Sequence, residues 1–224
     1  MYSTEQLLRT MTNAVTQLPE TLREQLILTK NEQSFSGLWV LEFEKTLSNY
    51  GSNFLLLENK GVSFRRNTGK GSKTTMNFHD ISLVDSSANF LMIIENKIWY
   101  HFDGAKGSKT PKLEPNVKRQ IKADISKIKI TLKQNKVSAQ GYLLINLVTP
   151  SNTKLLPKSY LKSHNAAISR TNNDIDAYIA EGVEGVENYL AQDLGIAELA
   201  HCNLVFGEGD NRSFLDSFCV RVDL

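Results

Sequence analysis

The segment from Ala139 to Val148 constrains the fold most, because it is largely apolar along its whole length. A strand of this kind is typical of the middle of a sheet whose two faces are both covered. Residues 115–134, just before it, predict a helix with apolar residues at helical spacing: Val117, Ile121, Ile125, Ile128 and Leu132. A second apolar strand is expected at 90–102. Strand, helix and strand then follow in the order of a crossover unit, which predicts an α/β or α+β fold with helices layered on a mixed sheet.

The chain is expected to form one domain, 1–224, in three parts: residues 1–50, 53–150 and 151–224. The first part predicts three helices, because residues that favour a helix start precede each apolar pattern. Those residues are Ser3 or Thr4, Pro19, and Ser34 or Ser36.

Turn residues divide the remainder of the chain. Short strands are expected at 53–57, 61–64 and 78–84, with polar loops at 67–75 and 103–115. The segment after Pro150 is expected to be loop to about residue 171. A helix at 174–194 and a hairpin of 204–206 with 214–222 complete the acidic C-terminal part.

The composition is ordinary for a soluble globular protein, with 41% hydrophobic and 22% charged residues. No apolar run approaches the length of a membrane span, and the first residues do not resemble a signal peptide. Cys202 and Cys219 fit a reducing compartment, either as two buried free thiols or facing each other in the terminal hairpin. We therefore expect a cytoplasmic protein without a membrane partner.

The net charge of +2 conceals a strong asymmetry along the chain. Residues 59–170 carry twenty basic and six acidic side chains, whereas residues 171–224 carry two basic and eleven acidic ones. A positive excess of this size favours a polyanionic partner, of which nucleic acid is the commonest. A solvated, lysine-rich surface is the alternative explanation.

Two acids and a lysine stand out in the positive segment. Asp80 opens one apolar strand, and Glu95 and Lys97 close the next one. Alternate side chains leave the same face of a strand, so Glu95 and Lys97 point the same way. If the two strands pair as a hairpin, Asp80 lies near Glu95, and the two carboxylates can bind a divalent metal beside an ammonium. The alternatives are an Asp80 that satisfies backbone donors and a surface Glu95–Lys97 pair.

The pattern Asp80…Glu95-x-Lys97 resembles the signature of the PD-(D/E)xK nuclease superfamily, and the run Ile93–Ile98 resembles its IENKI-type branch. The resemblance implies a restriction-endonuclease-like fold, with a mixed central sheet flanked by helices and with 53–150 as catalytic core. It also implies hydrolysis of phosphodiester bonds in DNA, with Mg²⁺ (or Mn²⁺) bound by Asp80 and Glu95. Lys97 would orient or help deprotonate the attacking water. His79 stands where the namesake pattern has proline.

The same resemblance implies two further site residues. Members often add a glutamate from the first helix, and the candidates are Glu32, Glu42 and Glu44, with Glu44 preferred for its spacing. Gln120 matches a glutamine that follows the motif, although Asp124 stands where that branch has tyrosine.

Basic residues on both sides of the motif are expected to contact DNA phosphates. They are Arg65, Arg66, Lys70, Lys73, Lys106, Lys109 and Lys112. A DNA-binding module without catalysis remains an alternative, as does an interaction protein that uses the acidic segment 171–224. A homodimer would suit cleavage of both strands of a duplex.

Overall fold

A computed structural model describes residues 2–48, 54–68, 71–85, 87, 89–104, 112–135, 138–209 and 211–224. For residues 46–48, 54–68 and 71–77 it describes the backbone elements but not the side chains. No helix in these ranges combines the length and the apolarity that are needed to cross a membrane.

Three N-terminal helices begin the chain: α1 (Thr4–Thr16), α2 (Glu20–Thr29) and α3 (Glu32–Ser48). Three strands, a short helix and a long helix follow: β1 (Phe54–Thr68), β2 (Gly71–Asp85), β3 (Phe90–Tyr100), α4 (His101–Gly104) and α5 (Pro115–Gln134). The C-terminal half contains β4 (Gln140–Thr149), a 3₁₀ turn (Thr153–Leu155), α6 (Lys158–Arg170), α7 (Ile175–Asn188), a π turn (Tyr189–Asp193), β5 (Leu199–Phe206) and β6 (Ser213–Val222).

The described strands form one mixed sheet in the order β1-β2-β3-β4-β6-β5. β3 and β4 are parallel, and α5 connects them, as the crossover pattern of the sequence predicts. The other neighbouring pairs are antiparallel. The predicted fold class, a mixed sheet flanked by helices, is confirmed.

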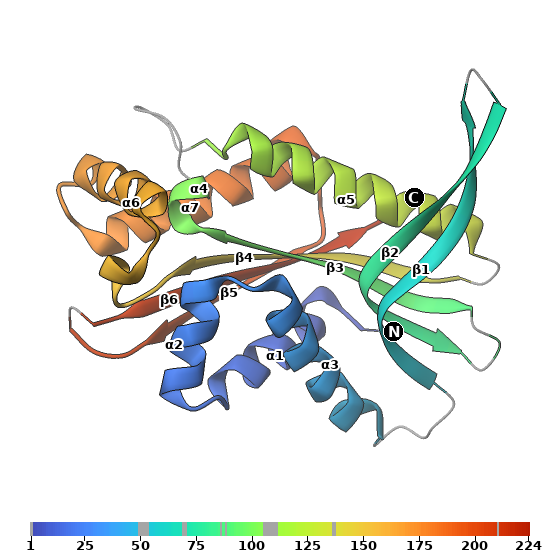
Figure 1. The fold of residues 1–224 in the computed structure, drawn as a ribbon, viewed down its shortest axis with the longest axis horizontal. Coiled ribbons are helices and arrows are strands. Elements are labelled where there is room, and N and C mark those ends of the chain that lie inside the picture. The colour runs from blue at the N-terminus through green and yellow to red at the C-terminus, as the bar shows by residue number, and fades with distance from the viewer. Residues whose placement is uncertain are drawn as a thin grey trace.

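Helices cover both faces of the sheet, α1, α2 and α3 on one and α5 with α7 on the other (Figure 1). β3 divides its apolar side chains between the two sides. Ile94 and Ile98 join the core under the N-terminal helices, whereas Ile93 and Trp99 join the core under α5. Adjacent residues of β4 alternate in the same way, which explains why its sequence is apolar throughout.

Local side-chain contacts set the helix starts. Ser3 caps α1 in a reciprocal capping box with Gln6. Asn31, rather than the predicted Ser34 or Ser36, caps α3 by accepting hydrogen bonds from the N–H groups of Gln33 and Ser34. Ser36 instead lies buried inside that helix, so the prediction placed the helix start too late.

The predicted loop at 67–75 and the predicted break between short strands at 58–60 are both wrong. β1 and β2 pair along almost their whole length, from Phe54 opposite Asp85 to Thr68 opposite Gly71. Cross-strand pairing therefore overrides the glycine-rich and polar composition of these segments.

The predicted loop at 151–171 is also wrong, because it contains α6. This helix buries only His164 and Ala167, which leaves little apolar periodicity in the sequence. The predicted helix at 174–194 and the C-terminal hairpin are confirmed by α7 with its π turn and by β5 and β6.

The two cysteines do not face each other. Cys219 lies opposite Ala200 and Cys202 opposite Ser217 in the β5–β6 pair. Both are free, Cys219 buried and Cys202 half-buried.

Candidate functional site

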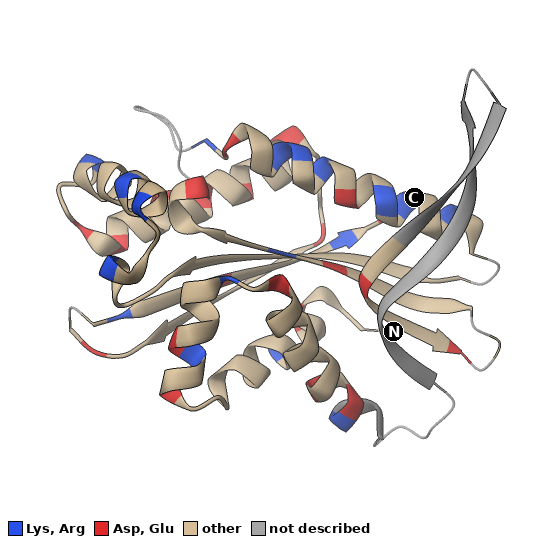
Figure 2. Ribbon diagram, viewed as in Figure 1, with Lys and Arg blue, Asp and Glu red and all other residues tan. Residues whose placement is uncertain are grey.

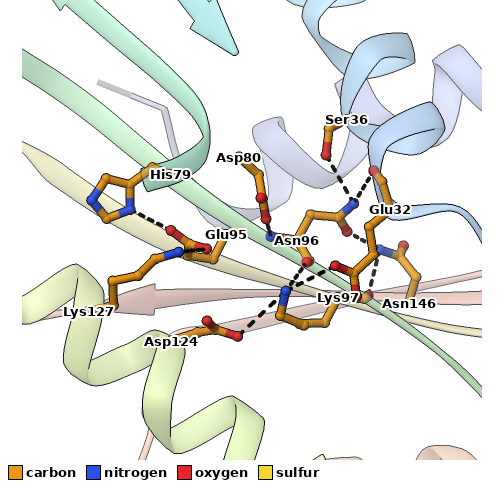
Figure 3. Close-up of polar contacts among 10 residues, drawn as sticks. All are labelled: Glu32, Ser36, His79, Asp80, Glu95, Asn96, Lys97, Asp124, Lys127 and Asn146. Carbon is orange, nitrogen blue, oxygen red and sulfur yellow. Dashed lines mark hydrogen bonds and ion pairs between the residues drawn. The ribbon is translucent and has the colours of Figure 1, made fainter. Parts of the chain in front are cut away.

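Asp80 lies where the β2–β3 pair opens. The antiparallel register places Ile81 opposite Ile94, so Asp80 and Glu95 follow at the same end of the pair. The carboxylate of Asp80 accepts a hydrogen bond from the backbone N–H of Asn96 over 2.7 Å (Figure 3). A hydrogen bond to a backbone donor is the alternative role that the sequence left open for Asp80. The same contact holds the carboxylate beside β3.

Glu95 is 1% exposed and contacts two basic side chains from outside the motif. His79 Nδ1 lies 2.5 Å from its Oε1, and Lys127 Nζ lies 2.5 Å from its Oε2 (Figure 3). The other ring nitrogen of His79 lies 2.7 Å from the hydroxyl oxygen of Thr131 on α5. A buried carboxylate requires such partners, because an unpaired charge in the interior is costly.

Lys97 lies among acidic side chains from two helices. Its Nζ is 3.1 Å from Glu32 Oε2 of α3 and 3.8 Å from Asp124 Oδ2 of α5 (Figure 3). Burial by itself lowers the pKa of Lys97, but the charges of Asp124, Glu32 and Asp80 outweigh it and raise the pKa. The ammonium therefore stays protonated at neutral pH.

For Asp124, the effect of burial on the pKa outweighs that of the neighbouring positive charges. Burial raises its pKa to about 6, Glu95 and Asp80 add to the increase, and Lys97 and Lys127 oppose it. These interactions place Asp80, Glu95 and Asp124 within one electrostatic cluster around two lysines.

Asn96 anchors β3 on the face of the sheet opposite to that of Glu95 and Lys97. Its side-chain amide donates to the backbone oxygen of Glu32 and to Ser36 of α3, over 3.2 and 3.3 Å. Its carbonyl accepts a hydrogen bond from Asn146 of β4 over 3.0 Å, and Asn146 in turn accepts one from Ser217 of β6. This buried network ties β3 to α3, β4 and β6 at the position between Glu95 and Lys97.

The two remaining predicted catalytic residues are both exposed. Glu44 is exposed on α3, twelve residues beyond Glu32 and hence about 18 Å farther along the helix axis. Glu32, a less favoured candidate, is the glutamate that contacts Lys97. Gln120 is exposed, and Asp124, one turn later, is the α5 residue that faces Lys97.

Most of the predicted DNA contacts cannot be placed. Lys70, Lys106 and Lys109 lie outside the described residues. Arg65, Arg66 and Lys73 belong to β1 and β2, but their side chains are not among those described. Lys112 is exposed just before α5.

The sequence reasoning missed the roles of three α5 residues, Asp124, Lys127 and Thr131, and of His79. The α5 residues have the spacing i, i+3 and i+7, so they form a polar stripe beside the apolar one. They contact Lys97, Glu95 and His79, respectively. A polar stripe at helical spacing next to a buried face is the signal that could have identified them.

The chemistry of these side chains fits a divalent cation. Carboxylate oxygens are the ligands that Mg²⁺ prefers, and two carboxylates suffice because the ion retains several waters. Asp124 Oδ2 is buried and accepts no hydrogen bond from the part of the chain that the structure describes, whereas Glu95 Oε2 is already paired with the ammonium of Lys127. Within that part, however, no three His, Cys, Asp or Glu side chains form a ready-made metal site.

Comparison with models of known protein families finds no match, and neither does comparison with curated proteins. Among solved structures, one described as "Crystal structure of SSO0001" is similar over 62% of this chain and 69% of that chain. The sequence identity is 14% and the TM-score is 0.24. A similarity this low carries no argument about fold or function.

Proposed function

We propose that the chain is a metal-dependent nuclease that hydrolyses phosphodiester bonds in DNA, as an endonuclease in restriction, phage defence or repair. The observation that carries the proposal is the convergence of Asp80, Glu95 and Lys97 at one end of the β2–β3 pair. The contact of Lys97 with Glu32, a glutamate of the N-terminal helices, adds support. The resemblance of the motif to PD-(D/E)xK nucleases supplies the reaction.

Asp80 and Glu95 would hold Mg²⁺ or Mn²⁺, with the buried Asp124 carboxylate beside them. When bound, the ion polarises the phosphoryl oxygen and makes water a stronger acid. Lys97 supplies a fixed positive charge that orients the attacking water and offsets charge on the phosphate. Its raised pKa favours this role over that of a base, because a protonated amine cannot accept a proton.

DNA is the proposed substrate because residues 59–170 carry the positive excess of the chain. Among the described residues, Lys and Arg positions are frequent along α5, whose polar stripe also contributes Asp124 and Lys127 to the cluster (Figure 2). A polyanion attracted to this surface would therefore lie near the cluster.

Cleavage of supercoiled plasmid with Mg²⁺ or Mn²⁺ tests the proposal. Asp80→Asn and Lys97→Met are expected to lower the rate roughly a hundredfold or more. Glu44→Gln serves as the matched control, because this glutamate is exposed and distant from the cluster. Asp80→Asn and Lys97→Met proteins that cut as fast as the wild type would refute the assignment.

A DNA-binding protein without catalysis is the second candidate. It is favoured by the contacts that satisfy Glu95 and Asp80 without any metal ion. It requires strongly salt-dependent DNA binding, no cleavage, and an affinity that does not change with a chelator or with Glu95→Gln.

A further inference from the structure

We propose that Lys127 is a built-in counter-cation for Glu95, which a divalent ion must displace, and that Lys127 thereby sets the metal affinity of the site. The inference rests on the proposed function. It concerns a residue outside the motif, contributed by α5, whose ammonium nitrogen lies 2.5 Å from Glu95 Oε2 (Figure 3).

The burial of Glu95 requires a positive partner whenever no metal ion is bound. This carboxylate is 1% exposed, and both of its oxygens contact basic side chains. An ionised carboxylate left without partners at such a position would be strongly destabilising. Lys127 therefore supplies, within the chain itself, the charge that a cation would supply.

The two partners of Glu95 differ in their freedom to move. His79 is fully buried, and Thr131 holds the far side of its ring. The side chain of Lys127 is 25% exposed and carries its ammonium on a flexible four-carbon stem. Lys127 can thus turn toward solvent while His79 continues to orient Glu95.

The positive charge of Lys127 acts on two neighbouring carboxylates. Its charge acts on Asp124 as well as on Glu95, and Asp124 also experiences the charges of Glu95 and Asp80. Among the described residues, Lys127 is the partner of Glu95 Oε2, and the buried Asp124 Oδ2 accepts no hydrogen bond. A divalent ion bound among these acids would repel the Lys127 ammonium, so occupation by one opposes occupation by the other.

Mn²⁺ binding by the full chain without DNA, measured by calorimetry, tests the inference. Lys127→Met removes the charge but keeps an unbranched apolar stem, and it is expected to tighten Mn²⁺ binding roughly tenfold or more. Lys129→Met is the matched control. It removes the same charge two residues away, where Lys129 lines a surface groove of about 320 Å³ with Ile125 and Leu194. Its affinity for Mn²⁺ is expected to equal that of the wild type.

Thermal unfolding supplies a second readout that does not depend on activity. Without metal, Lys127→Met is expected to unfold at a lower temperature than the wild type, and Mn²⁺ is expected to raise that temperature more in the variant. If Lys127→Met does not fold without metal, Lys127→Gln and Lys127→Arg replace it. The neutral glutamine variant is then expected to bind Mn²⁺ at least tenfold more tightly than the arginine variant.

The outcomes separate this inference from the proposed function. A wild type that binds Mn²⁺ and cuts DNA, with equal or weaker binding by Lys127→Met, would overturn the role of Lys127 alone. Absence of Mn²⁺ binding in wild type and variant alike would overturn both proposals.

Discussion

Replacing Asp124 with asparagine is expected to make the metal-free protein more stable at neutral pH. In the folded state burial raises the pKa of this carboxyl to about 6 from an ordinary value of 3.8. Between these two values the folded protein binds the proton more tightly than the unfolded chain does. Stability therefore falls as the pH rises from about 4 to about 6 and stays reduced above it. Asparagine has a similar shape but carries no charge, so it removes this cost.

The size of the effect follows from the same two values. At 1.36 kcal/mol per pKa unit, the difference between 3.8 and about 6 corresponds to at most about 3 kcal/mol. The Asp124 side chain is 13% exposed, and its 3.8 Å approach to Lys97 is too long for a hydrogen bond. Solvent screening reduces the cost, so we expect a gain of about 1–2 kcal/mol at neutral pH.

Urea unfolding in the presence of EDTA, repeated between pH 4 and pH 8, measures the free energies. The wild type should lose stability relative to Asp124→Asn as the pH rises from about 4 to about 6, and the two should converge near pH 4. Asp193→Asn is the control, because a hydrogen bond from Lys118 lowers the pKa of this exposed acid, and its loss should bring no gain. An Asp124→Asn protein less stable than the wild type at pH 7 would show that Lys97 requires the carboxylate.

Further substitutions test two buried contacts, one beside the site and one between α4 and α7. Asn96→Ala is expected to lower the free energy of unfolding by about 2–3 kcal/mol, because buried partners such as Asn146 lose a hydrogen bond. Urea unfolding measures it, and a loss below about 0.5 kcal/mol would contradict the network. Gly185→Ala is expected to cost about 3 kcal/mol, because the added Cβ would lie 1.7 Å from the backbone oxygen of Gly104. Gly37→Ala, with nothing within 4 Å, should instead gain up to about 1 kcal/mol, and equal effects at the two glycines would refute the packing argument.

The glycines of α7 show that a correct interpretation of local helix propensity can miss the role of a residue in tertiary packing. Gly182 and Gly185 weaken a helix by propensity, as the sequence indicates. The structure shows that they admit α4, since a Cβ on Gly182 would lie 2.7 Å from the backbone oxygen of His101. No periodic pattern in the sequence encodes which two helices approach so closely.

The candidate site likewise contains residues that the sequence could predict and residues that it could not. Asp80, Glu95 and Lys97 could be predicted to converge, because strand alternation and one antiparallel pair are enough to bring them together. The choice of Glu32 over Glu44 could not, because it depends on which turn of α3 crosses β3. Lys127 and Asp124 were missed because their partners lie about 30 residues away across a helix–sheet interface.

The sequence by itself determined the elements whose signals are local: the N-terminal helices, the helix at 115–134 and the buried strand after it. Their hydrophobic periods and start signals act within a few residues, so they can be read without the fold. Tertiary structure decided the long β1–β2 pair, the partners of Glu95 and the acids around Lys97. Those depend on pairing and burial between distant segments, where neighbours in space fix the charge and orientation of each side chain.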